Sequence, residues 1–312
     1  TNYINNMTAA LFLEQLLNGL QLGMTLFLMS AGLTLVFGVM GLINLAHGSL
    51  YMIGAFCCAW ITGLTDSFVL GLLAGFCGAA IAGLIIEVLV IRRLYARGHL
   101  DQVLATFALI LIISEGTSWI FGADPLYLNI PSWLSGSLAL WGGGSYPIYR
   151  LVIIVIGLLI AFGLYLLITK TRLGMRIRAG ESDREMIAAL GVDIRTIYTL
   201  VFALGAALAG LAGALVSTLY SVEVGMGEPV LILALVVIVI GGIGSVKGAL
   251  VASILVGLVD TLGRVFLPNI LGLFINNDDV ATLSASLASV LVYILMALIL
   301  AIRPQGLFSI HD

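Results

Sequence analysis

The residues best suited to chemistry in this chain are four polar side chains that interrupt long apolar stretches. Asn44, His47 and Ser49 lie in the segment N-L-A-H-G-S, and Glu115 lies in I-I-S-E-G-T-S. Polar and ionisable side chains within membrane-spanning segments are costly and usually functional. We therefore expect these four residues to line a path for a polar solute. The alternative is that they make interhelical hydrogen bonds.

Glycines around the first group favour either a broken helix or a closely packed helix at that point. Gly41, Gly48 and Gly54 flank Asn44 and His47. A helix that is broken at membrane depth presents free backbone N–H and C=O groups to a ligand. Such a site suits a solute that carries both a positive and a negative charge.

The same region does not predict a catalytic or metal site. His47 and Ser49 are two positions apart, so they do not share a face of a helix, and the apolar segments contain no second histidine. The cysteines, Cys57, Cys58 and Cys77, show no C-x-x-C spacing. We expect no catalytic residues and no bound metal, and we interpret the cysteines as packing residues.

The composition indicates a membrane protein. Of the 312 residues, 61% are hydrophobic and 9% are charged, whereas soluble domains contain about 45–50% apolar and about 25% charged residues. The excess apolar surface must face lipid. The net charge of -3 offers no electrostatic surface for nucleic acid. The first basic residue is Arg92, so we expect no cleavable signal peptide.

A spanning helix needs about 20 mostly apolar residues, and nine segments are candidates. The segments 46–63 and 229–246 are short or interrupted by glycine, so each is alternatively re-entrant or broken, which would leave eight full spans. We therefore expect an all-α, polytopic bundle of about eight to nine transmembrane helices. The candidate spans are 11–37, 46–63, 68–91, 102–121, 151–169, 196–219, 229–246, 248–266 and 282–302.

The basic residues predict the orientation, because cytoplasmic loops retain Lys and Arg. They gather at 92–97 and at 170–195, which we expect to be cytoplasmic. This arrangement puts the N-terminus outside and the C-terminus inside. It also predicts an outer loop over about residues 122–149, whose tryptophans either anchor the membrane interface or help to dock an external protein.

The inner loop, about residues 170–195, contains the signals of a short helix. Ser182 is a good N-cap, and Glu185 three residues later completes a capping box. Gly191 can end the helix in the left-handed conformation. Such a helix either docks into a groove of a cytoplasmic protein and transmits its motion, or rests on the membrane surface.

Four motifs, in order, resemble those of the branched-chain amino acid ABC transporter permeases. The resemblance extends over about residues 11–308 and is strongest to the shorter of the two related permease types, which begins directly with the N-L-A-H-G segment. The motifs lie at 32–56, at 176–192 together with 202–215, at 241–250 and at 303–308.

The resemblance implies an assembly in the bacterial inner membrane. Residues 1–312 would form a single transmembrane permease domain beside a second permease subunit. Two cytoplasmic ATPases would power it, and a periplasmic substrate-binding protein would supply it. The chain lacks a G-x-x-x-x-G-K-[ST] phosphate loop, so we expect it not to be an enzyme, with ATP and Mg bound by the ATPase subunits.

The resemblance also assigns the short inner helix as the coupling helix that contacts the ATPase. The strict E-A-A-x-x-x-G spacing is absent, because Gly191 follows Ala189 by two positions. The residues that match the loop of the family are Ser182, Asp183, Glu185, Ala188, Ala189 and Gly191.

The implied function is import of branched-chain or other hydrophobic amino acids, by alternating access that the partner ATPases drive. Urea, short amides and aromatic acids are alternative substrates, because relatives of this permease type are similar in sequence. An alternative from another class is a secondary transporter or channel without an ATPase. It would use Glu115, His47 and Asp260 for ion or proton coupling, and it would leave the capped inner helix without a purpose.

Overall fold

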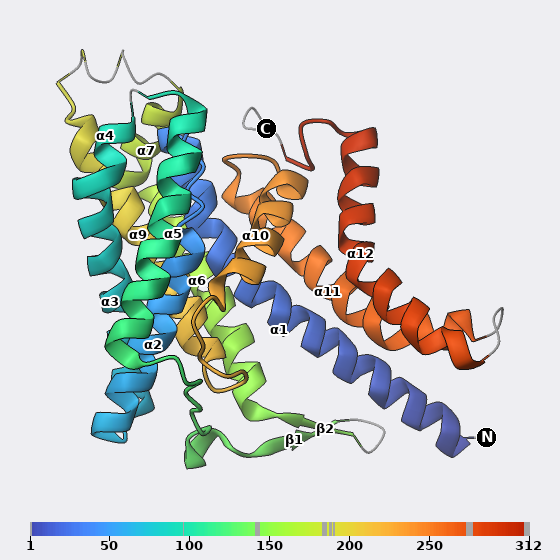
Figure 1. Ribbon diagram of the computed structural model, residues 1–312. Coiled ribbons are helices and arrows are strands. Elements are labelled where there is room, and N and C mark those ends of the chain that lie inside the picture. Colours follow the sequence, from blue (N-terminus) through green and yellow to red (C-terminus); the bar gives the residue numbers. More distant parts are fainter. Residues whose placement is uncertain are drawn as a thin grey trace.

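The computed structural model describes residues 2–95, 97–140, 144–182, 186, 189, 191–272 and 277–308. It is a bundle of helices with one small pair of strands at one end (Figure 1). Among the described residues, eight helices are long and apolar enough to cross a membrane. They are α1 (Asn2–Met40), α2 (His47–Thr65), α3 (Phe68–Ile86) with its extension, α5 (His99–Phe121), α6 (Ile148–Lys170), α9 (Ile194–Val216), α11 (Val246–Leu271) and α12 (Asn277–Ile302).

The all-α bundle is confirmed, and the span count follows the eight-span alternative. The segment 229–246 forms α10 (Gly227–Gly241), which has 15 residues. A helix of that length covers about 22 Å, less than the roughly 30 Å of a bilayer core. It is followed by Gly242, whose φ of +100° favours glycine. The segment 46–63 is not re-entrant, because α2 is a full-length helix.

Helices α1 and α9 form the buried centre of the bundle, where glycines allow backbones to touch. A Cβ added to Gly32 on α1 would lie 2.5 Å from the carbonyl oxygen of Gly205 on α9. Gly54 on α2 meets Gly210 on α9 in the same way. The small-residue face of 202–215 therefore packs against helices of this chain, as such faces do in membranes.

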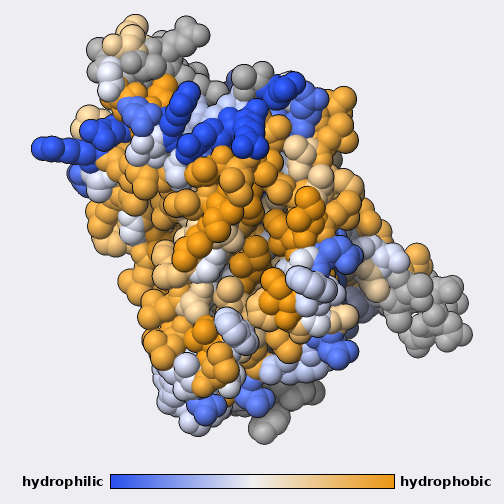
Figure 2. Space-filling view, turned by 60° about the vertical axis from the view of Figure 1, so that its left-hand side comes forward, coloured by the Kyte–Doolittle hydropathy of each residue, from blue (hydrophilic) through white to orange (hydrophobic). Residues whose placement is uncertain are grey.

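The two ends of the bundle differ in charge. The turn after α4 (Arg92–Leu94), helix α7 (Arg172–Ser182) and the C-terminal end lie together at the top of Figure 1, and the N-terminus lies at the bottom. Figure 2 shows hydrophilic residues along the top edge and a broad hydrophobic band below them. The described residues of the basic segments 92–97 and 170–195 thus lie at one end of the molecule.

The opposite end carries the 122–149 segment, which holds the only strands among the described residues. Strand β1 (Ser137–Ala139) pairs antiparallel with β2 (Ser145–Pro147). Earlier in the same segment, the backbone of Leu126 exchanges two hydrogen bonds, of 2.9 and 2.8 Å, with the backbone of Val222. These bonds attach this segment to the connection between α9 and α10.

Candidate functional site

The chain breaks between α1 and α2, at the point where the glycines predict a broken helix. Gly41 has φ +66°, a conformation that L side chains rarely adopt, and residues 41–46 are not helical. Asn44 is buried, and its Oδ1 accepts a hydrogen bond of 3.1 Å from the backbone N–H of Ala46. This Asx-type contact shapes the turn that leads into α2.

His47 begins α2 with a side chain that is 0% exposed. By geometry, neither of its ring nitrogens, nor Nδ2 of Asn44, has a hydrogen-bond partner among the described residues. A buried polar group without a partner costs about 1–3 kcal/mol. The imidazole nevertheless lies close to the backbone of Met29 on α1, which is a contact of the kind that the alternative interpretation expects. Nδ2 of Asn44 makes no such contact, so the break offers this donor to a solute or water.

The start of α10 lies against this break. A Cβ added to Gly48 would lie 2.7 Å from the carbonyl oxygen of Gly227, the first residue of α10. Ser49 is buried one position further along α2, and its N–H donates to the carbonyl of Ala46 at 3.1 Å. Asn44, His47 and Ser49 thus lie within one short buried stretch of chain, beside the start of a second helix.

Glu115 lies elsewhere, on α5, which contacts α2. Its side chain is exposed and makes no hydrogen bond or ion pair with the described residues. A carboxylate within a spanning helix is costly in lipid. The face of α5 that holds Glu115 therefore needs water or a polar partner from outside this chain.

The inner loop differs in part from its sequence prediction. Ser182 is the last residue of α7 and is itself helical, and Met186 and Ala189 further along the loop are helical too. The start of the predicted short helix lies outside the described residues. Helix α7 begins after Thr171, whose Oγ1 accepts a hydrogen bond of 3.1 Å from the N–H of Gly174 and so acts as the cap.

The end of the same loop agrees with the prediction. Gly191 has φ +82°, which confirms the left-handed conformation expected there. Ala189 is helical and exposed. The predicted coupling residues Asp183, Glu185 and Ala188 lie outside the described residues.

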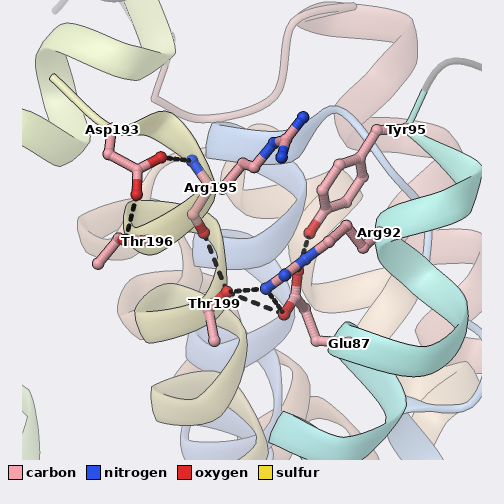
Figure 3. Close-up of polar contacts among 7 residues, drawn as sticks. All are labelled: Glu87, Arg92, Tyr95, Asp193, Arg195, Thr196 and Thr199. Carbon is pink, nitrogen blue, oxygen red and sulfur yellow. Dashed lines mark hydrogen bonds and ion pairs between the residues drawn. The ribbon is translucent and has the colours of Figure 1, made fainter. Parts of the chain in front are cut away.

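A polar cluster joins α3 to α9 at this end of the bundle (Figure 3). Glu87 is 0% exposed and begins the π-helix η1 (Glu87–Ile91), which continues α3. Its carboxylate accepts hydrogen bonds from Arg92 at 3.0 and 3.3 Å, from Tyr95 at 2.5 Å and from Thr199 at 2.8 Å. This charge is fully paired, as a buried carboxylate must be.

The cluster lies directly after the inner loop. Asp193 caps α9, because its carboxylate accepts hydrogen bonds of 3.0 Å from the N–H of Arg195 and 2.5 Å from Thr196 Oγ1. The bond from Thr196 is the main cause that lowers the pKa of Asp193 below its ordinary value. Thr199 lies one turn later and contacts Glu87. The start of α9 is thus fixed both to the loop and to α3.

The sequence analysis did not predict two polar contacts, one of Glu87 and one of Asp260. Glu87 and Thr199 are 112 residues apart, and nothing local predicts their contact. The ion pair between Asp260 and Arg264 on α11 could have been predicted, because an i,i+4 spacing places opposite charges side by side on a helix. Among the described residues, no three His, Cys, Asp or Glu side chains gather as a metal site requires.

Comparison with known proteins places the chain in a protein family. A family model described as "Branched-chain amino acid transport system / permease component" matches residues 15–300. No solved structure gives a significant match.

Three relatives illustrate the range of similarity. The chain is 34% identical over 268 residues to the high-affinity branched-chain amino acid transport system permease protein BraD of Pseudomonas aeruginosa, which covers 81% of this chain and 86% of that protein. It is 28% identical over 316 residues to the corresponding protein LivH of Escherichia coli K12, with 96% of each chain covered. It is 29% identical over 257 residues to the autoinducer 2 import system permease protein LsrD of Salmonella paratyphi B, which covers 76% of this chain and 69% of that protein.

Proposed function

Because the chain belongs to the family of branched-chain amino acid transport system permease components, we propose that it forms the membrane path of an ATP-driven importer for branched-chain or other hydrophobic amino acids. The observation that carries this proposal is the match of the family model to residues 15–300, nearly the whole chain. Relatives that are named for branched-chain amino acid transport support the substrate. One relative is named for autoinducer 2 import instead, so the substrate of this chain has to be identified by experiment.

The buried break between α1 and α2 supports transport as the task of the chain. Asn44 and His47 offer polar atoms without partners at membrane depth. Intramembrane polar groups of this kind mark solute pathways. We assign Asn44, His47, Ser49 and Glu115 to the path, the first three at the break and Glu115 on a face of α5 that a second permease subunit would cover.

The end with the basic segments fits the cytoplasmic side. Loops that are rich in Lys and Arg stay in the cytoplasm, so the segments 92–97 and 170–195 would face inwards. The N-terminus and the 122–149 segment would then face outwards. This orientation leaves the outer segment available to a periplasmic substrate-binding protein and the inner loop available to ATPases.

The inner loop is the proposed contact with two cytoplasmic ATPases, which would bind ATP and Mg. Ala189 is exposed there, and Gly191 ends the helical segment. The proposed coupling residues are Ser182, Asp183, Glu185, Ala188, Ala189 and Gly191. Motion of this loop would pass through the start of α9 to Thr199 and Glu87, because these two side chains are hydrogen-bonded.

The test is uptake by the assembled complex. The chain would be co-expressed with the permease, ATPase and binding-protein genes of its own organism, purified in mild detergent and placed in proteoliposomes. We expect ATP-dependent uptake of radiolabelled leucine, isoleucine or valine, and none when the ATPase phosphate loop is inactivated.

Two results would contradict the proposal. Purification of the chain without ATPases, with uptake that an ion gradient drives, would favour a secondary transporter. ATP-dependent uptake of urea, short amides or aromatic acids in place of aliphatic amino acids would keep the importer and change its substrate.

A further inference from the structure

A cavity of about 710 Å³ lies between α1, α11 and the segment that connects α9 to α10. The parts of the chain that line it belong to the outer half of the bundle. They include Asn18 in the first half of α1, Arg150 at the start of α6 and Tyr220 just after α9. Binding sites for small molecules commonly enclose about 300–1,000 Å³, so the cavity has room for an amino acid.

Charges of both signs line this cavity. On α11, Asp260 is 8% exposed, and Arg264 donates two hydrogen bonds to it, of 2.8 and 3.0 Å. Arg150 reaches the cavity from α6 and donates to Asn18. Glu223 contributes an exposed carboxylate from the connecting segment. Ionisable groups in a spanning helix usually face the bundle interior or a water-filled cavity and mark solute paths.

The rest of the wall is apolar. Leu22 and Leu26 come from α1, and Val230 and Leu233 come from α10. A solute with charged groups alone would gain no binding free energy from this surface. An aliphatic side chain would gain about 25 cal/mol of binding free energy for each Å² of apolar surface that it buries. The cavity therefore combines a charged part with a hydrophobic part.

Tyr51 connects the cavity to the break between α1 and α2. It lines the cavity and lies one helical turn after His47 on α2, so both side chains lie on the same face of the helix. Pro229, in the first turn of α10, is also part of the wall. A solute in the cavity would thus lie on the outer side of the unpaired polar atoms at the break.

We propose that this cavity receives the transported solute from outside and binds it as a zwitterionic amino acid with an aliphatic side chain. The inference rests on the proposed function and adds the place and the chemistry of recognition. The carboxylate of the solute accepts hydrogen bonds from Arg150 and Arg264. Its ammonium group lies near Asp260 and Glu223, and its side chain packs on the leucines and valines.

Thiol protection tests occupancy without the binding protein, which has a selectivity of its own. The probe is Thr261→Cys in the cavity wall, in a background in which Cys57, Cys58 and Cys77 are replaced by alanine. The complex of permease and ATPase subunits in nanodiscs is treated with a charged methanethiosulfonate reagent. Thr65→Cys, at the outer end of α2 and away from the cavity, is the control.

We expect leucine to slow modification at position 261 fivefold or more and to leave position 65 unchanged. We expect 4-methylpentanoate, which lacks the ammonium group, and 3-methylbutylamine, which lacks the carboxylate, to protect at least tenfold less well than leucine. Equal protection by all three compounds would overturn the zwitterion assignment. Absence of modification at 261, or modification that leucine does not slow, would overturn the cavity as a binding site.

Uptake separates this proposal from the proposed function. The paired variant Asp260→Asn/Arg264→Gln removes both charges together and leaves no unpaired buried ion. We expect its KM for leucine uptake to rise tenfold or more, while Arg93→Gln, an exposed arginine at the opposite end, keeps the wild-type KM. An unchanged KM in the paired variant, with active wild type, would overturn this inference alone. Absence of ATP-driven leucine uptake by the wild type would overturn the proposed function.

Discussion

The hydroxyl of Thr199 lies 2.8 Å from a carboxylate oxygen of Glu87, although the two residues are 112 positions apart in the chain. The bond joins the end of α3 to the first turns of α9, directly after the inner loop. Glu87 is 0% exposed and lies on a π-helical segment, a local geometry that is frequent at functional sites.

This relationship predicts an energetic coupling between the two residues. Glu87→Gln removes the charge of the acceptor and Thr199→Val removes the donor, and the double variant should lose less stability than the sum of the single ones. The expected coupling energy is about 0.5–3 kcal/mol, measured by reversible unfolding in detergent. Thr65→Val, at the other end of the bundle, should be additive with Glu87→Gln. Additivity of Thr199→Val as well would contradict the contact.

The break between α1 and α2 predicts that a substitution of His47 lowers transport without lowering the stability of the fold. The imidazole of His47 lies near the backbone of Met29, but neither ring nitrogen makes a hydrogen bond of good geometry. His47→Leu should therefore change the free energy of unfolding by less than about 1.5 kcal/mol, because removing a poorly paired buried polar group can be neutral or stabilising. Leucine uptake should fall at least tenfold. Thermal unfolding and uptake would be measured on the same preparation, and a variant with normal uptake would remove His47 from the path.

The glycine contacts predict a large difference between two substitutions on α2. Gly54→Ala drives a methyl group into the backbone of Gly210, and overpacking of this kind costs about 1–3 kcal/mol. Gly63→Ala is the matched control, because a Cβ there meets nothing within 4 Å. It should be neutral or slightly stabilising, since alanine is the better helix former. Unfolding temperatures that fall equally in both variants would contradict the close packing.

The inner loop predicts a conformational requirement at Gly191. An alanine at position 191 must adopt φ +82°. Gly180→Ala on α7 is the control, because Gly180 has no positive φ. A Cβ has room at both positions. The strain of the left-handed conformation is about 1–2 kcal/mol. We expect Gly191→Ala alone to lower the ratio of leucine transported to ATP hydrolysed at least threefold in proteoliposomes. Equal ratios in the two variants would show that the loop geometry does not matter for coupling.

Asp193 predicts an acid-dependent contribution to the start of α9. Hydrogen bonds, first of all from Thr196, lower its pKa below the ordinary value of 3.8. A carboxylate whose folded-state pKa is depressed stabilises the fold above its unfolded pKa, and this contribution is lost as the pH falls through the folded pKa. The unfolding temperatures of wild type and Asp193→Asn should therefore differ most near neutral pH and converge on acidification. A constant difference between pH 7 and pH 3 would contradict the role of the charge.

Much of this architecture could be predicted from the sequence because membrane spans have a strong compositional signal. The break at 41–46 was predictable from Gly41, and the left-handed end of the inner helix was predictable from Gly191, since few other residues adopt a positive φ. Helix α7 was not predicted because Thr171 is a weak N-cap signal in a segment rich in arginine. The partners of Glu87 and the walls of the outer cavity depend on contacts between distant helices, which no local pattern records.

The two backbone hydrogen bonds between Leu126 and Val222 have a mechanical consequence. They join the 122–149 segment, which the proposed orientation places outside, to the connection between α9 and α10, which carries Tyr220 and Glu223 at the edge of the cavity. A protein that bound to the 122–149 segment and displaced it would also displace the connection between α9 and α10. In the proposed importer, docking of a binding protein on the 122–149 segment would then act directly on the wall of the cavity that receives the solute.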